Sequence, residues 1–188
     1  MNITPVDNFN NLFLIENLVS ESLLNKIIST PWLNFNYIDW NPGYKFRRTI
    51  EMCNKLVEWH DQWNDTVLSI WDQLQHRLNV NLQEFKPNDT RWWLDVAGFK
   101  TGIHLDNAGV LAAMQMYWQG EPQLGTTFYD SSANDTNNTP VRYQTKCIPN
   151  TGYIMINGPD QWHGTTFQVP ENTLRLTSYT LLPLLDAF

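Results

Sequence analysis

The first part of the chain carries apolar side chains at helical spacing. In residues 20–30 the apolar positions recur every three or four residues and end before Pro31, which predicts a short helix. The same spacing returns in residues 50–78. This second pattern predicts one long helix, or two helices broken near residues 64–66.

Residues 32–48, WLNFNYIDWNPGYKFRR, separate the two helical patterns and are rich in aromatic side chains, with a Pro-Gly turn. This composition predicts an edge hairpin or a covering loop. As a covering loop the segment is a candidate lid or wall of a substrate site. Tyr44, Arg47 and Arg48 are then its candidate substrate contacts.

From about residue 90 the hydrophobic period becomes two, which is the period of β-strands. Short aromatic or β-branched segments alternate here with turns rich in Gly, Pro and Asn. The segments are RWWLDVAGF, GVLAAMQMYW, GTTFYD, VRYQTKCI, GYIMIN, TTFQV and LRLTSYTLL. Many short strands of this kind predict an all-β sandwich or barrel.

We therefore expect a single domain over residues 1–188 that is mainly β with N-terminal helices. Residues 1–89 are expected to form a mostly helical support with the aromatic loop, and residues 90–182 the β core. The sequence contains no internal repeat and no linker. The helices are expected to cover one sheet of the core.

The chain of 188 residues is acidic, with a formal net charge of −7, and 42% of its residues are hydrophobic. This composition is typical of a globular protein, and the charge gives no general attraction to nucleic acid or anionic membranes. No apolar run approaches the length of a membrane span, and the N-terminus lacks the pattern of a signal peptide. We expect a cytoplasmic protein with no nucleic-acid partner and no membrane span.

The cysteines and two of the four histidines offer no site. Cys53 and Cys147 are far apart and in no metal-binding spacing, which fits a reducing compartment. His60 and His76 lie among charged neighbours in the predicted helix, so we expect both at the surface.

The stretch GIHLDN, residues 102–107, places two metal-binding side chains in a segment that otherwise has the pattern of a strand. Side chains two apart in a strand point the same way, so His104 and Asp106 share one face. A third candidate, His163, follows in DQWHGTTF. Two imidazoles and one carboxylate form the facial triad of non-haem Fe(II) oxygenases, which leaves metal positions open for substrate and O2.

Arg175 lies inside the apolar strand segment LRLTSYTLL. A buried arginine is costly without an anionic partner, and its planar fork suits a carboxylate. Arg175 is therefore a candidate anchor for the far carboxylate of a ligand whose other end binds the metal. Thr177 faces the same way and adds a hydroxyl. Asp95 is either a turn cap or a polar group of the pocket.

These residues together resemble the Fe(II)/2-oxoglutarate-dependent dioxygenases. GTTFYD is similar to the segment after the first core hairpin in the prolyl 4-hydroxylase-like branch, and IPNTGYIMINGPDQWHG is similar to its Pro-x-x-Gly strand before the distal His. Small members of this branch are carried by phages and marine microbes. The resemblance covers about residues 90–182. This chain lacks the Tyr that many prolyl hydroxylases carry before the first His.

The resemblance implies a double-stranded β-helix, or jelly roll, with helices packed on the major sheet. It implies Fe(II) as metal, 2-oxoglutarate as cosubstrate and O2 as oxidant. Its implied metal ligands are His104, Asp106 and His163. Its implied cosubstrate contacts are Arg175, which pairs with the C5 carboxylate, together with Thr177, Tyr117 and Gln115.

The implied reaction is hydroxylation with release of succinate and CO2. Asp106 favours this outcome, because relatives that halogenate lack the carboxylate. The implied substrate is a peptidyl residue such as proline, or a small amino-acid-type metabolite, so a peptide or a small molecule is the expected partner.

Two other classes fit the same ligands. The first is a cupin-like jelly roll that binds metal without turnover, and the second is a zinc hydrolase. Arg175 favours the oxygenase over the simple metal-binding barrel, which needs no carboxylate anchor. The hydrolase lacks an evident general base.

Overall fold

The computed structural model describes residues 1–9, 11–35, 46–51, 58–78, 90–106, 110–130 and 139–183. Within them the strands form two antiparallel sheets. The large sheet runs in the order β1 (Asn2–Pro5), β2 (Leu12–Glu16), β8 (Thr151–Ile156), β5 (Val110–Gln119), β10 (Arg175–Pro183), β4 (Thr90–Asp95) and β3 (Arg47–Glu51). The small sheet runs in the order β7 (Val141–Gln144), β6 (Thr127–Tyr129) and β9 (His163–Gly164).

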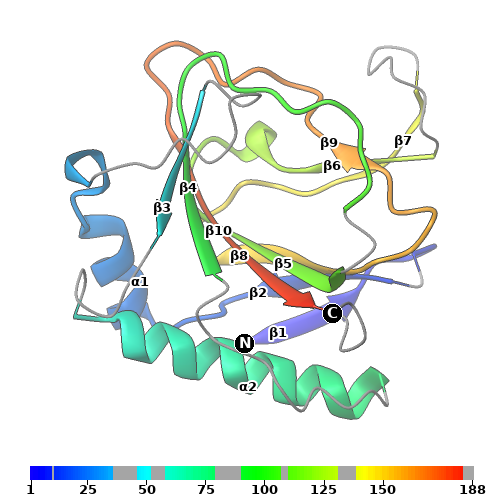
Figure 1. Ribbon diagram of the computed structural model, residues 1–188, viewed down its shortest axis with the longest axis horizontal. Coiled ribbons are helices and arrows are strands. Elements are labelled where there is room, and N and C mark those ends of the chain that lie inside the picture. Colours follow the sequence, from blue (N-terminus) through cyan, green and yellow to red (C-terminus); the bar gives the residue numbers. More distant parts are fainter. Residues whose placement is uncertain are drawn as a thin grey trace.

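The two sheets form a jelly roll with the helices on the outside. Figure 1 shows α2 (His60–Leu78) running beneath the large sheet, with the small sheet on the opposite side. The second helix, α1 (Glu21–Ser29), lies beside the same outer face. The expected fold, a mainly β jelly roll with helices against its major sheet, is confirmed.

Helix α1 begins and ends where the sequence predicts. The Ser20 hydroxyl accepts a hydrogen bond from the Leu23 backbone N–H at 3.3 Å and so caps the first turn. At the other end the Thr30 hydroxyl donates to the Lys26 carbonyl at 2.7 Å, one residue before Pro31 stops the helix. The side chains of Leu23 and Ile27, four apart, are buried.

Five tryptophans pack the helices against the large sheet. Trp92 of β4 stacks on Trp32 with ring centroids 4.8 Å apart and on Trp118 of β5 at 5.7 Å. Trp63 of α2 and Trp59 meet the Trp92 ring edge-on, at 5.4 and 5.2 Å. Because each such ring buries about 150–250 Å² on folding, this cluster forms a large part of the core on the helix side.

The other face of the large sheet is polar at its centre. Along β5 the side chains of Met116 and Trp118 pack on the helix side, and those of Gln115 and Tyr117 point between the sheets. Strand β10 follows the same alternation beside β5, since Thr177 pairs with Tyr117 in the antiparallel register. One face of the sheet therefore holds the helices, and the other encloses a cavity.

Two sequence expectations for the secondary structure are wrong. The helix expected over residues 50–78 begins only at His60, because residues 47–51 pair with β4 as a strand. From His60 it continues unbroken to Leu78. Beside its helices, the N-terminal part supplies β1 and β2, which extend the large sheet. The segment TTFQV is not a strand, because β9 ends at Gly164.

His60 is buried rather than exposed. Only 4% of its surface is accessible, and its Nδ1 accepts a hydrogen bond from the Asn64 side-chain amide at 3.1 Å. His60 precedes the buried Trp63 by three residues and so shares its face of α2. Tyr44, Cys53 and the His76 side chain lie outside the described residues, as does most of the proposed lid, residues 36–45.

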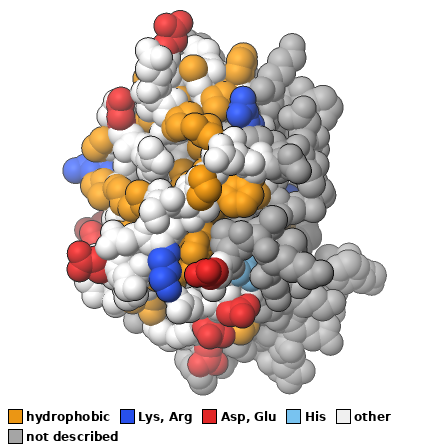
Figure 2. Space-filling model, turned by 90° about the vertical axis from the view of Figure 1, so that its left-hand side faces the viewer, with side chains coloured by type: hydrophobic (Ala, Val, Ile, Leu, Met, Phe, Trp, Pro, Cys, Tyr) orange, Lys and Arg blue, Asp and Glu red, His pale blue; other side chains and the backbone are white. Residues whose placement is uncertain are grey.

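None of the helices in the described ranges is both long and apolar enough to cross a membrane. Figure 2 shows the face beside α1, where Lys and Arg side chains of the described residues stand apart from one another among acidic and apolar ones. This face carries mixed charge rather than a basic patch, in keeping with the acidic composition.

Candidate metal centre and its cavity

A backbone bridge joins the two histidines expected to bind metal. The His104 N–H donates to the His163 carbonyl, and the His163 N–H donates to the His104 carbonyl, both at 2.9 Å. Gly164 makes this approach possible, because a Cβ there would lie 2.6 Å from the Gly102 carbonyl oxygen. This bridge holds together the segments around His104 and His163, which are 59 positions apart in the sequence (163 − 104).

Each of the two imidazole rings is oriented by its own backbone. His104 Nδ1 lies 2.9 Å from the Gly102 carbonyl oxygen, and His163 Nδ1 lies 2.9 Å from the Gln161 carbonyl oxygen. A carbonyl only accepts, so both Nδ1 atoms carry a proton, and in this tautomer the Nε2 atom is the one that can bind a metal. Carbonyl partners of this kind commonly fix the tautomer of metal-binding histidines.

Asp106 completes the group. One ligand atom from each of His104, Asp106 and His163 lies within 4.8 Å of the others. Asp106 Oδ1 is 3.6 Å from His163 Nε2, and its Oδ2 accepts a hydrogen bond from the Tyr179 hydroxyl at 2.8 Å. The three residues that the sequence suggested as a group therefore lie together in the structure.

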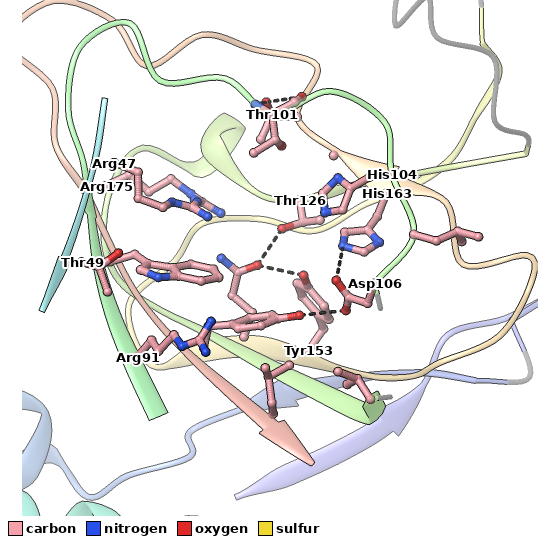
Figure 3. Close-up of a pocket in the computed structure, with 18 residues that line it drawn as sticks. Arg47, Thr49, Arg91, Thr101, His104, Asp106, Thr126, Tyr153, His163 and Arg175 are labelled. Carbon is pink, nitrogen blue, oxygen red and sulfur yellow. Dashed lines mark hydrogen bonds and ion pairs between the residues drawn. The ribbon is translucent and has the colours of Figure 1, made fainter. Parts of the chain in front are cut away.

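The triad opens into a cavity of about 350 Å³ between the two sheets. Figure 3 shows His104, Asp106 and His163 at one end of this cavity and Arg47 and Arg175 at the other. The cavity can therefore hold a short ligand that reaches from the triad to the arginines.

Arg175 begins β10 and is buried to 1% exposure. Its Nη1 donates to Asp95 Oδ2 at 2.5 Å, and its Nε donates to the Leu124 carbonyl at 2.7 Å. Asp95 also accepts from Arg47 Nε at 2.6 Å and from Arg47 Nη2 at 3.0 Å. Asp95 is fully buried outside the residues that line the cavity, and it joins two arginines that do line it.

Gln115 lines the cavity and takes part in a hydrogen-bond network. Its Oε1 accepts from the Tyr153 hydroxyl at 2.8 Å and from the Thr126 hydroxyl at 3.1 Å. With the oxygen used by these two donors, the amide Nε2 is the group that Gln115 offers to a ligand. The inward direction expected for Gln115 is confirmed.

Tyr117 and Thr177 point between the sheets but do not line the cavity. The Tyr117 hydroxyl is bonded to Thr126 at 3.0 Å and to Thr145 at 2.6 Å, and its ring lies 5.4 Å from the Arg175 guanidinium carbon. Thr177 is fully buried, and its hydroxyl has no hydrogen-bond partner among the described residues.

Burial and neighbouring charges set the protonation of the site. Burial and the nearby His104 ring lower the pKa of His163 below its ordinary value, which keeps the ring neutral and able to bind metal. Burial and the Asp106 charge raise the pKa of Tyr179 well above its ordinary value, so its hydroxyl stays a donor. Burial lowers the pKa of Arg175, but Asp95 more than offsets this effect and the guanidinium stays charged.

Sequence reasoning missed Tyr179 and Thr126 and did not connect Arg47 with Asp95. Tyr179 lies four residues after Arg175, so the period of two that selected Thr177 would also have selected it. Thr126 lies within GTTFYD, one of the predicted strand segments. The sequence indicated Arg47 as a candidate substrate contact, but its place beside Asp95 depends on the pairing of β3 with β4.

No protein-family model matches the sequence, and no curated protein matches it. Solved structures do match. A prolyl-4-hydroxylase from Pseudomonas putida aligns with a TM-score of 0.67 at 11% identity, over 93% of this chain and 93% of that one. The viral collagen prolyl hydroxylase of Paramecium Bursaria Chlorella virus-1 aligns with a TM-score of 0.65 at 11% identity, over 97% and 100%.

HygX from Streptomyces hygroscopicus, solved with nickel, 2-oxoglutarate and hygromycin B bound, aligns with a TM-score of 0.63 at 12% identity. The alignment covers 93% of this chain and 84% of that one. At such identities the likeness concerns the fold. The chain has the jelly-roll fold of the iron- and 2-oxoglutarate-dependent oxygenases, prolyl 4-hydroxylases among them.

Proposed function

We propose that the protein is an Fe(II)- and 2-oxoglutarate-dependent oxygenase that hydroxylates its substrate. The observation that carries this proposal is one cavity with a His-Asp-His triad at one end and a buried arginine at the other. A metal-binding barrel needs only the first of these features. A dicarboxylate that chelates metal at one end needs both.

The donor set fits iron. His104 and His163 offer their Nε2 atoms, and Asp106 offers one carboxylate oxygen, which is the combination that non-haem Fe(II) oxygenases use. These three residues would hold the metal. When bound, the iron supplies the activation of O2 and the cosubstrate supplies the electrons, with succinate and CO2 as products.

The opposite end of the cavity fits the C5 carboxylate of 2-oxoglutarate. Arg175 is charged, buried and oriented by Asp95 and Leu124, so it needs no rearrangement to receive a carboxylate. The Gln115 amide adds a neutral donor to the lining of the same cavity. Tyr117 and Thr177, expected as direct contacts, are buried outside the cavity lining, and the Tyr117 ring lies 5.4 Å from the Arg175 guanidinium carbon.

The remaining task of the chain is to orient the substrate and to exclude water from the metal. The cavity volume of about 350 Å³ leaves room beside a cosubstrate for part of a small molecule or one side chain of a peptide. Among the structural neighbours, one prolyl hydroxylase is in complex with a peptide fragment and HygX has hygromycin B bound. We propose a peptidyl residue or a small metabolite as substrate.

The test is an anaerobic titration. Fe(II) and then 2-oxoglutarate are added to the protein, and the weak visible charge-transfer band of a chelated 2-oxoacid is measured. We expect the band with the native chain, its loss in His163→Ala and a lower 2-oxoglutarate affinity in Arg175→Leu. Metal binding without any band would overturn the oxygenase in favour of a metal-binding jelly roll or a hydrolase.

A further inference from the structure

We infer that Arg47 is a second anchor for the distal carboxylate of the cosubstrate, so that a pair of arginines held by Asp95 selects 2-oxoglutarate. This inference rests on the proposed function and adds a residue to it. Arg47 belongs to the edge strand β3, outside the segment that carries the other site residues.

The sheet register places the three side chains in one row. Asp95 of β4 pairs with Arg175 of β10 on one side and with Arg47 of β3 on the other. All three side chains therefore emerge on the same face of three adjacent strands. Figure 3 shows the two arginines side by side at the end of the cavity opposite the triad.

The charges of this row favour an incoming anion. Asp95 carries one negative charge and is fully buried, and it contacts two guanidinium groups at 2.5 and 2.6 Å. The three side chains together carry a charge of +1. Since charge is costly to bury, a ligand carboxylate that completes two cations and two anions is favoured at this place.

Arg47 is also the more accessible of the two arginines. Its side chain is 12% exposed, against 1% for Arg175, and both line the cavity. Its guanidinium carbon lies 3.9 Å from the centre of the Trp93 ring and 4.1 Å from that of the Phe99 ring. Two aromatic faces and a bidentate carboxylate fix the fork in place, so little entropy is lost when a ligand binds.

The experiment compares two 2-oxoacids of equal chain length. 2-Oxoglutarate carries the distal carboxylate, whereas 2-oxopentanoate has the same chelating end and lacks it. Both are titrated anaerobically into Fe(II)-loaded native chain, Arg47→Met and Arg48→Met, and dissociation constants are read from the charge-transfer band. Arg48 is the matched control, because it is the next residue of β3, is exposed and points to the opposite face.

We expect Arg47→Met to weaken 2-oxoglutarate binding about 10- to 100-fold, the usual worth of a charged hydrogen bond, and to leave 2-oxopentanoate binding unchanged. Arg48→Met should change neither constant. Arg47→Lys keeps the charge but loses the fork, so an intermediate loss is expected. If circular dichroism shows that Arg47→Met does not fold, the dissociation constants of Arg47→Lys decide the question.

Three outcomes would overturn the inference. If Arg47→Met binds 2-oxoglutarate as tightly as the native chain, Arg47 does not touch the cosubstrate. If both acids lose affinity equally, Arg47 acts on the shape of the cavity. If the native chain binds the two acids equally, no distal carboxylate anchor exists. A native chain that binds neither acid would instead refute the proposed function itself.

Discussion

Replacing Tyr179 with Phe removes a single hydroxyl that holds Asp106, one of the three proposed metal ligands. In the native chain this hydroxyl donates to Asp106 Oδ2 at 2.8 Å, and the ring stacks on Trp93 with centroids 4.6 Å apart and an angle of 19°. The stacked ring needs no rearrangement in Tyr179→Phe. The variant therefore isolates the hydrogen bond from the packing.

The size of the effect follows from the exposure of Asp106. A hydrogen bond to a charged group is worth about 1.5–3 kcal/mol. The Asp106 side chain is 12% exposed, so water can take the place of the lost donor, and we expect the lower end of this range. A loss of about 1.4 kcal/mol corresponds to a tenfold weaker metal affinity, which agrees with the range for residues that orient metal ligands.

The assay is a competition between the protein and a chelator of known affinity for Fe(II) under anaerobic conditions. Tyr153→Phe is the matched control, because it also removes a hydroxyl from the cavity wall, but one that is bonded to Gln115. Its metal affinity should equal that of the native chain. A Tyr179→Phe affinity within twofold of native, or an equal loss in Tyr153→Phe, would refute the orienting role of Tyr179.

Three further predictions concern stability. Asp95→Ala leaves two arginines without their shared carboxylate and should lower the unfolding free energy by about 3–5 kcal/mol in urea titrations; a loss below about 1 kcal/mol would contradict the ion-pair geometry. Thr177→Val removes a buried hydroxyl without a described partner, so the unfolding free energy should stay equal or rise, and a clear drop would reveal a missing hydrogen bond. Because the pKa of His163 is lowered on folding, stability of the metal-free protein should be fully present above pH 6.5, the ordinary histidine value, and fall as the pH drops below it. This decline should be shallower in His163→Gln, and an unchanged slope would exclude His163 as its source.

The meeting of His104 and Asp106 could be predicted because their pattern is local. His104 and Asp106 are two apart, and any extended segment brings such a pair to one face. His163 and Arg175 were identified by residue type within strand-like segments. Their meeting with the first pair required only that the chain form a jelly roll.

The elements that the sequence did not predict depend on pairing between distant segments. Ile50 fits the helical spacing of the residues after it, but residues 47–51 pair with β4 and form a strand. TTFQV alternates like a strand, yet its first and last residues bond to the loop backbone at Thr101 and Phe99. The place of Arg47 beside Asp95 follows from the same β3–β4 register and has no mark in the local sequence.

The paired backbones of His104 and His163 affect when the entropy cost of the proposed metal site arises. One part arises on folding, and the other on capture of the ion. Four hydrogen bonds, two between the backbones and two from the rings to carbonyls, fix both imidazoles when the chain folds. The entropy lost in bringing two distant segments together then belongs to folding and not to metal capture. Loading and removal of the ion should therefore leave the protection of these two amides against hydrogen exchange nearly unchanged.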